Sequence, residues 1–336
     1  MACETDRAIG PCELRSVPCD YCGTDEAEVL LTATDPTGTV PGEFNAVACR
    51  RCGLVRTDPQ PTPETLGLAY PTDYSPHDAS VRVPPPPTGF RCWCLVNYRG
   101  YPLDRRAPAA VRALLGPLAA VKFRGRYWIG YLPYEGDGRL LDFGCGVGRY
   151  VAQMAAAGWK AEGLDLAPKA VSAGRRAGLT IHQGTLPGAD LPDGRYDAVT
   201  MWHALEHVPS PKATLEAARR LLRPGGRLMV VMPRFDSLSA RWSGASWYGL
   251  WLPRHLTHFT TAALRRHVAA AGFEVKQICS LRRPSLVRET LATLAEDRGS
   301  AVLRLLSRWR FPARLLSHIS LLARRTDEVV CLARRP

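Results

Sequence analysis

The sequence predicts an α/β fold with a small cysteine-rich domain at its N-terminus. Apolar strand-like runs alternate with helical patterns over residues 138–280, which is typical of a parallel sheet covered by helices. A glycine-rich turn follows the first of these strands, and two C-x-x-C pairs lie within the first 52 residues. We divide the chain into a zinc-ribbon domain at 1–75, a proline-rich linker and helical lid at 76–134, and a main domain at 135–336.

The composition is that of an ordinary globular protein, with 336 residues of which 46% are hydrophobic and 22% charged. No apolar run reaches the roughly 18 residues that a membrane-spanning helix needs. The first residues lack a basic stretch followed by an apolar one, so we expect a cytoplasmic protein. The net charge of +13 comes from 39 Arg and only 5 Lys. This ratio is typical of GC-rich coding, and we do not take it as a sign of nucleic-acid binding.

The two cysteine pairs are Cys19 with Cys22 and Cys49 with Cys52, each followed by a glycine that permits a tight turn. Strand-like pieces at 28–32 and 44–48 separate them. This spacing predicts a zinc ribbon in which four thiolates hold one structural Zn²⁺, with no open position for chemistry. The remaining early cysteines receive no ligand role, and the last two are expected in packing: Cys3, Cys12, Cys92 and Cys94.

The region between the two domains contains a proline-rich stretch at 57–89 and an amphipathic helical pattern at 104–132. Its apolar face and its aromatic residues are Val111, Leu114, Leu115, Leu118, Phe123, Tyr127, Trp128, Tyr131 and Tyr134. The helix either packs on the main domain or forms a lid over a substrate pocket, and the two roles are compatible.

The glycine-rich turn is Gly144-Cys145-Gly146-Val147-Gly148, which follows Asp142 at the end of a strand. A dinucleotide fingerprint needs its third glycine one residue later, where Arg149 stands. Asp142 would lie awkwardly beside a pyrophosphate but suits a cationic ligand such as S-adenosylmethionine. The next strand ends at Asp165, 21 residues after Gly144, where a carboxylate can accept both ribose hydroxyls.

Two further stretches complete a family pattern. Residues 195–203 resemble the fourth strand, and 221–231 the helix end, P-G-G turn and fifth strand, of class I S-adenosylmethionine-dependent methyltransferases. Residues 52–59 and 247–256 are similar to bacterial members with an N-terminal zinc ribbon. The resemblance implies a Rossmann-like sheet of seven strands with an antiparallel final hairpin, and we place the last two strands at 273–278 and 328–333.

The resemblance also implies which residues hold the cofactor. The loop would wrap the methionine part, Asp142 would lie near its ammonium, and Asp165 would hold the ribose. Gln183 and Thr185 stand where the family often has an acid, so adenine N6 is expected to be bound differently. The predicted cofactor contacts are Asp142, Gly144, Cys145, Gly146, Gly148, Asp165, Leu166, Gly184, Thr185, Leu186 and His203.

The sequence His203-Ala204-Leu205-Glu206-His207 matches the inverted zinc-protease motif, but it follows a strand directly and stops before Pro209. The resemblance places it instead at the carboxyl end of the fourth strand, facing the transferred methyl. We take His207 as the first candidate base, with activity rising with pH through the histidine range. His203 is expected to border the cofactor, and Glu206 to orient a histidine or cap the helix.

Residues after the fifth strand either close over the acceptor or hold the scaffold: Trp247, Trp251, Arg254, His255 and His258. Of these, His255 is the next candidate base. Residues 282–325 are an arginine-rich insertion before the last strand, expected as two helices broken near Gly299 and Pro312. It forms a solvated hairpin over the active site or an amphipathic surface for a membrane or lipid-linked acceptor; nucleic-acid binding and self-association are weaker alternatives.

Together these patterns predict an S-adenosylmethionine-dependent methyltransferase acting on an oxygen, or a carbon, of a small-molecule acceptor such as a sugar or specialised-metabolite intermediate. The alternative is an RNA base methyltransferase that reads its substrate with the zinc ribbon. The ribbon lacks an aromatic and basic stripe, which disfavours nucleic acid as a partner. A third hypothesis is a binding module that keeps the fold but has no catalytic activity. The intact glycine-rich loop and Asp165 argue against it.

Overall fold

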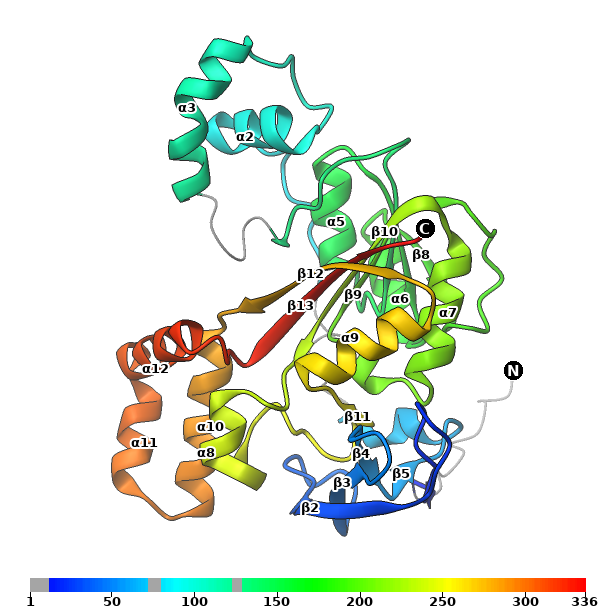
Figure 1. Cartoon of the computed structure of the whole chain (residues 1–336), viewed down its shortest axis with the longest axis vertical. Helices are drawn as coiled ribbons and strands as arrows, with labels where there is room; N and C mark the ends of the chain where they lie inside the picture. The colour runs from blue at the N-terminus through cyan, green and yellow to red at the C-terminus, as the bar shows by residue number, and fades with distance from the viewer. Residues whose placement is uncertain (1–11, 72–79, 123–128) are drawn as a thin grey trace, which may run out of the picture.

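The computed structural model describes residues 12–71, 80–122 and 129–336 (Figure 1). Four residues discussed above lie outside this part of the chain: Cys3, which received no ligand role, and the aromatic residues Phe123, Tyr127 and Trp128.

The centre of the molecule is a seven-stranded sheet with the order β12-β13-β10-β9-β6-β7-β8. Strands β8, β7, β6, β9 and β10 are mutually parallel, and β13 runs antiparallel between β10 and β12. This confirms the predicted sheet and its final hairpin. The strands are β6 (Arg139–Phe143), β7 (Lys160–Asp165), β8 (Thr180–Gln183), β9 (Tyr196–Trp202), β10 (Leu222–Pro233), β12 (Glu274–Leu281) and β13 (Glu328–Arg334).

Helices cover both faces of this sheet because consecutive residues of its strands are apolar, and successive side chains point to opposite faces. Leu141 of β6 and Val230 of β10 face one hydrophobic core, whereas their neighbours Leu140 and Met229 face another. The covering helices are α5 (Arg149–Ala156), α6 (Pro168–Arg176), α7 (Pro211–Leu221) and α9 (Thr261–Ala270). The carboxyl ends of the parallel strands remain at one edge, where ligands bind in such sheets.

The N-terminal segment forms a four-stranded antiparallel sheet with the order β11-β4-β3-β2. Strands β2 (Ala27–Thr34) and β3 (Glu43–Cys49) were predicted, and β4 (Val55–Asp58) follows them. The fourth strand, β11 (Thr257–His258), comes from the loop after β10, far along the chain. The sequence did not predict that a strand from residues 257–258 would join the sheet of the N-terminal segment, because β11 has only two residues and depends on β4 for its backbone partners. Short pieces β1 (Leu14–Arg15), β5 (Gln60–Pro61) and η1 (Leu66–Ala69) complete the segment.

A buried ion pair joins this four-stranded sheet, which we call the ribbon sheet, to the main domain. Arg254, just before β11, has no exposed surface and donates hydrogen bonds of 2.7 and 2.9 Å to the two carboxylate oxygens of Asp35. Asp35 also accepts the backbone N–H groups of Thr37 and Val40. Burial alone would raise the pKa of Asp35, but the bonds from Arg254, Thr37 and Val40 outweigh it and lower the pKa. Arg254 is therefore a scaffold residue.

Two helices occupy the region expected to be linker and lid. Helix α2 (Gly89–Arg99) was not predicted, and α3 (Ala109–Lys122) lies within the predicted amphipathic stretch. The apolar face expected to pack is largely exposed, with Leu114 79% and Leu118 54% exposed. Instead, α3 turns Ala119 toward Cys94 of α2, since the small side chains let the two helices approach. Cys94 is thus a packing residue, as expected.

The insertion between β12 and β13 has three helices rather than two: α10 (Pro284–Asp297), α11 (Ala301–Arg308) and α12 (Arg310–Leu322). The first break is at Gly299, as predicted, with φ of 60°. The second is at Trp309, and Pro312 lies inside the first turn of α12, where a missing N–H costs no helical hydrogen bond. Among the described residues, no helix combines the length and apolarity needed to cross a bilayer.

We predict that Arg254→Met lowers the free energy of unfolding by about 3–5 kcal/mol, because it leaves the carboxylate of Asp35 buried without its partner. Chemical denaturation would measure this. Lys276→Met is the matched control, since Lys276 pairs with Glu274 on the exposed surface, and it should cost less than about 1 kcal/mol. The double variant Asp35→Asn/Arg254→Met should lose clearly less than the sum of the two single losses. Additive losses of unfolding free energy would show that Arg254 and Asp35 do not stabilise the fold as a pair.

Candidate active site

The glycine loop connects β6 to α5 at the carboxyl edge of the sheet. Gly144, Gly146 and Gly148 all have positive φ, of 69°, 55° and 86°. A side chain at Gly144 would meet the Cβ of Ala204 at 2.5 Å, and one at Gly148 would meet Leu179 and Ile181. The first glycine is therefore needed for packing against the segment after β9, and not only for the approach of a ligand. Cys145 packs its sulfur over Gly163 of β7.

Two carboxylates border this loop. Asp142 is 2% exposed and accepts a 2.6 Å hydrogen bond from Thr200. Burial raises its pKa to about 7, against the effect of that bond and with a contribution from the charge of Asp165. Asp165, at the end of β7, accepts the backbone N–H groups of Gly146 and Ala167, so its carboxylate is oriented by the loop itself.

These groups fit the cofactor that the sequence predicts. A buried carboxylate whose charge is disfavoured is stabilised by a cation such as the ammonium of a methionine moiety. Leu166, directly after Asp165, is 57% exposed and offers an apolar surface beside the acid that the sequence predicts to hold the ribose. Gly184 has a φ of 147° and donates its N–H to the carbonyl of Asp165, which brings the end of β8 to the same place. Thr185 is half-buried there, whereas Leu186 is 4% exposed within the main core.

His203 follows β9 with a φ of 50° and is held between two acids. Its Nε2 lies 2.7 Å from Glu328 and its Nδ1 3.4 Å from Glu206. Burial would lower the pKa of His203, but the bonds and charges of Glu206 and Glu328 raise it to about 9. Arg283 shares the carboxylate of Glu328. Because both ring nitrogens face carboxylates in a protonated ring, His203 is a poor acceptor for a proton from a substrate.

His207, in the short helix η2 (Leu205–His207), has the opposite environment. Its Nδ1 lies 2.9 Å from the hydroxyl of Tyr70 and 3.1 Å from the carbonyl of Arg254. Burial lowers the pKa of His207 to about 3, with a contribution from His255. The ring is therefore neutral at every working pH, and the activity rise expected through the histidine range does not follow from it. A carbonyl only accepts, so a proton on Nδ1 leaves Nε2 as the basic atom.

His255 and Trp251 pack around His207, with ring centroids 4.6 and 5.8 Å from it. The Nδ1 of His255 lies 2.9 Å from the carbonyl of Gly249, and burial lowers its pKa to about 3 as well. His258 is 4% exposed and bonded to Thr57, which assigns it to the junction with the ribbon sheet. Trp247 is 3% exposed and belongs to the ribbon-side core.

Glu206, His207 and His255 have ligand atoms within 4.8 Å of one another, close enough to share an ion. Glu206 is 2% exposed, and within the described ranges its carboxylate accepts no close hydrogen bond apart from the ion pair with His203. The motif of residues 203–207 does not lie along a single helix, since β9 ends at Trp202 and η2 begins at Leu205. The zinc-protease interpretation is therefore excluded by the local backbone.

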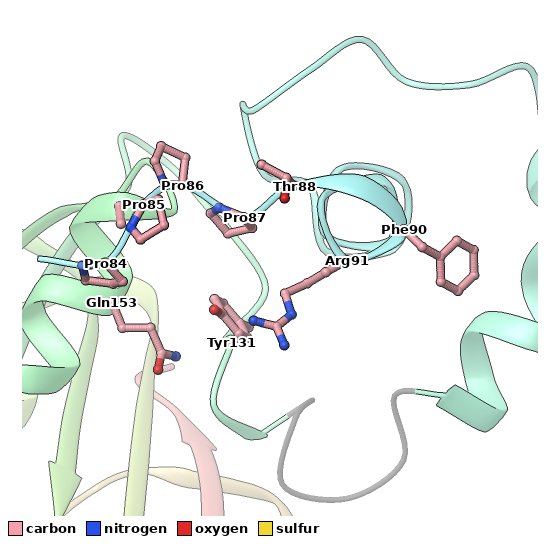
Figure 2. A pocket seen from close by; sticks show the side chains of 10 residues that line it. Pro84, Pro85, Pro86, Pro87, Thr88, Phe90, Arg91, Tyr131 and Gln153 are labelled. Carbon is pink, nitrogen blue, oxygen red and sulfur yellow. The ribbon is translucent and has the colours of Figure 1, made fainter.

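A cleft next to the carboxyl edge of the central sheet separates α2 from α5. One part, of about 490 Å³, is lined by Arg91, Tyr131, Arg149, Tyr150, Gln153 and Trp202, and it continues into a part of about 690 Å³ beside the prolines at 84–87. Figure 2 shows Arg91 reaching from α2 toward Tyr131, with Gln153 on the α5 side. The Tyr150 hydroxyl and the Trp202 indole N–H are buried without a well-formed hydrogen bond to any described residue.

Sequence reasoning did not single out Arg91, Tyr150 or Trp202. The latter two flank the glycine loop and the end of β9 directly, so their positions beside the two motifs were a usable signal. Arg91 lies in a helix that the proline-rich composition concealed.

The four predicted zinc ligands come together in the ribbon sheet. The sulfurs of Cys19 and Cys52, and those of Cys22 and Cys49, are 3.5 Å apart, and all four lie within 4.8 Å of one another. Tetrahedral Zn²⁺ with bonds of about 2.3 Å needs sulfurs about 3.8 Å apart. Gly23 and Gly53 have φ of 74° and 72° and close the two turns by donating to Cys19 and Cys49. The donor set fits a structural zinc.

A family profile described as a methyltransferase domain matches residues 104–278, just over half of the chain. The chain belongs to this methyltransferase family. The match begins ahead of the glycine loop and ends in β12, so it includes the loop, both carboxylates and the histidine cluster. The parallel strands of the central sheet, the glycine loop and the start of β12 are therefore parts of one family pattern, whereas β13 lies outside the match.

Curated relatives of this methyltransferase carry the name ubiquinone biosynthesis O-methyltransferase. The protein from Cereibacter sphaeroides is 37% identical over 131 residues, covering 37% of this chain and 53% of its own length. That from Aromatoleum aromaticum is 31% identical over 156 residues, covering 43% and 67%. The chain spans about half the length of the first of these. A solved Thermotoga maritima structure, titled an S-adenosylmethionine-dependent methyltransferase and possible histamine N-methyltransferase, is 20% identical, covering 66% and 89%, with a TM-score of 0.43.

We predict about one zinc per chain by elemental analysis, held by the four thiolates. Cys22→Ser should lose the metal and loosen the ribbon, because metal binding and folding are coupled in such sites. The matched control is Cys12→Ser, which changes a cysteine of the same segment outside the cluster and should keep the zinc. Retention of zinc by Cys22→Ser would contradict the assignment, and two metal ions per chain would point to the group around Glu206.

We predict that the raised pKa of His203 makes stability fall in alkaline solution. A group whose pKa is higher in the folded state stabilises the fold fully below its ordinary value near 6.5. That contribution is lost as the pH rises through about 9. Other groups titrate in this range, so the quantity to measure is the difference in unfolding free energy between wild type and His203→Gln from pH 6 to about 10. The difference should shrink with pH, and a constant difference would refute the assignment.

Proposed function

We propose that this protein transfers a methyl group from S-adenosylmethionine to an oxygen of a small-molecule acceptor. The observation that carries the proposal is the meeting of two features at one edge of the sheet. The glycine loop with Asp142 and Asp165 lies there, and the neutral His207 follows the adjacent strand β9 in the short helix η2. The curated relatives named as O-methyltransferases favour oxygen over carbon.

The cofactor, when bound, supplies a methyl group already activated by a sulfonium. The chain's part is to bind, orient and exclude water. Asp142 would face the ammonium and Asp165 the ribose hydroxyls, with Leu166 and the turn at Gly184 beside the adenine. Asp165 is suited to its task because two backbone N–H groups already orient it.

A hydroxyl acceptor must lose its proton, and His207 is the group we assign to this step. Its Nδ1 is engaged by Tyr70 and by the carbonyl of Arg254, which fixes the ring and leaves Nε2 to accept the proton. The nearby carboxylate of Glu206 would stabilise the imidazolium that forms. His255 supports the ring from the other side. His203 is assigned a positioning role, since it is already charged.

The cleft between α2 and α5 is the acceptor site we propose. Its arginines and aromatic rings suit a flat or hydroxylated molecule that carries an anionic group. A sugar nucleotide or a phenolic specialised-metabolite intermediate has this chemistry, and so does a lipid-linked acceptor with an acidic head. The orphaned hydroxyl of Tyr150 and the indole of Trp202 would bond to its polar atoms.

The test compares binding of S-adenosylhomocysteine with turnover. Asp165→Ala should weaken binding roughly ten- to a hundredfold in calorimetry, the scale of one or two charge-assisted hydrogen bonds. His207→Ala should leave binding within about threefold and lower turnover by about a hundredfold or more. Because His207 stays neutral, turnover should not follow a histidine titration between pH 6 and 8.

The matched control is His182→Ala, which changes a partly exposed histidine on β8 bonded to Glu162 and outside the cluster. It should change neither binding nor turnover appreciably. Near-normal turnover by His207→Ala would move the base elsewhere. Failure of the wild type to bind S-adenosylhomocysteine at all would overturn the proposed function.

A further inference from the structure

The insertion between β12 and β13 places three helices at the same edge of the sheet as the candidate active site. Glu328, where β13 begins, pairs with Pro233 at the end of β10. Arg283, just before α10, contacts both Glu328 and His203. Val287 and Leu291 of α10 pack with Trp242 and Ala313, so α10 anchors the insertion to the body. Figure 1 shows α11 and α12 beyond it, projecting away from the main sheet.

Helices α11 and α12, which we call the outer helices, present their large apolar side chains to solvent. No residue of α11 is buried, and its stripe of Val302, Leu305 and the following Trp309 is 57–68% exposed. In α12 the buried residues are the small Ala313, Ser317 and Ser320. The exposed ones on the other side are large: Phe311 at 71%, Leu315 at 49%, Ile319 at 43% and Leu322 at 73%.

This is the reverse of the arrangement in a helix that packs on its own protein, where the large apolar residues face inward. Exposed apolar patches of this kind mark surfaces that bind something. Within the insertion the pattern is confined to the outer helices, since α10 buries six of its residues in the usual way.

The charge of the segment identifies what it binds. Residues 298–326 contain no Asp or Glu and seven arginines: Arg298, Arg304, Arg308, Arg310, Arg314, Arg324 and Arg325. A second copy of this chain would bring arginines against arginines, which disfavours self-association through this face. Nucleic acid would neutralise the arginines but would leave most of the exposed leucine, isoleucine and valine surface in water.

The surface of an anionic bilayer can bind both the exposed apolar side chains and the arginines. Apolar and aromatic side chains enter the boundary between head groups and acyl chains, and arginines beside them meet lipid phosphates. Trp309 lies between Arg308 and Arg310, the combination typical of the interfacial zone. Both helices are far too short to span a bilayer, so the fit is to its surface.

We propose that the outer helices bind the surface of a membrane that contains anionic phospholipids. The chain rests on the bilayer through α11 and α12, and the anchoring of α10 near His203 keeps the candidate active site close to that surface. The interaction does not require methyl transfer, so it stands or falls independently of the proposed function.

The test is co-sedimentation of the full chain with vesicles of phosphatidylcholine, alone or with about one third phosphatidylglycerol. Binding to the anionic vesicles should be at least tenfold stronger and should weaken with salt. Trp309→Ser/Phe311→Ser and, separately, Arg304→Gln/Arg314→Gln should each lower it about tenfold or more. All four side chains are exposed, so the fold and the binding of S-adenosylhomocysteine should be unchanged.

Matched controls lie outside the insertion. Val29→Ser/Leu30→Ser removes two exposed apolar residues of β2, and Arg176→Gln removes an exposed arginine at the end of α6. Both should bind vesicles like the wild type. The proposal is overturned if the wild type does not bind anionic vesicles, or if the insertion variants bind these vesicles as well as the control variants do. It is equally overturned if the same variants instead abolish a dimer, seen by light scattering, or salt-sensitive binding of RNA.

Discussion

The buried ion pair between Arg254 and Asp35 is the constraint on which the rest of this arrangement depends. It fixes the loop after β10 against the ribbon sheet, and that loop carries Trp251, His255 and the strand β11. A bidentate pair of this kind tolerates little displacement, because each charge is out of water and needs the other. The ribbon and the methyltransferase sheet are therefore one unit mechanically, although they are far apart in sequence.

The zinc cluster then acquires an indirect connection to the chemistry. A closed shell of four thiolates has no position for a substrate, so the metal's contribution is the order of the sheet it holds. That sheet provides β4 as the partner of β11, and the chain just beyond it supplies Tyr70, whose hydroxyl bonds to His207. The segment that carries the four cysteines is thus joined to the candidate site at two places, through β11 and through Tyr70.

The two histidines of one short motif differ in charge because their surroundings differ. His203 lies between Glu206 and Glu328 and is held as a cation, whereas burial against Tyr70, Trp251 and His255 keeps His207 neutral. Glu206 lies between these two environments. A charged ring and a neutral ring therefore lie within five residues of each other, which is the basis for the different roles that we propose for His203 and His207. Desolvation and local charge decide the roles here, and residue type alone does not.

The sequence by itself determined the elements that depend on local pattern. Apolar runs that alternate with helical patterns predicted a parallel sheet covered by helices, and the family resemblance implied its seven strands. The spacing of four cysteines predicted their cluster, and Asp142 with the glycine turn predicted the cofactor edge. Tertiary structure alone decided the rest, because it depends on contacts between distant residues. It paired β11 with β4, gave Arg254 its partner and made His207 neutral while charging His203. It also turned the small residues of α12 inward, which periodicity could not show, since a helix has the same apolar spacing whichever face its neighbours cover.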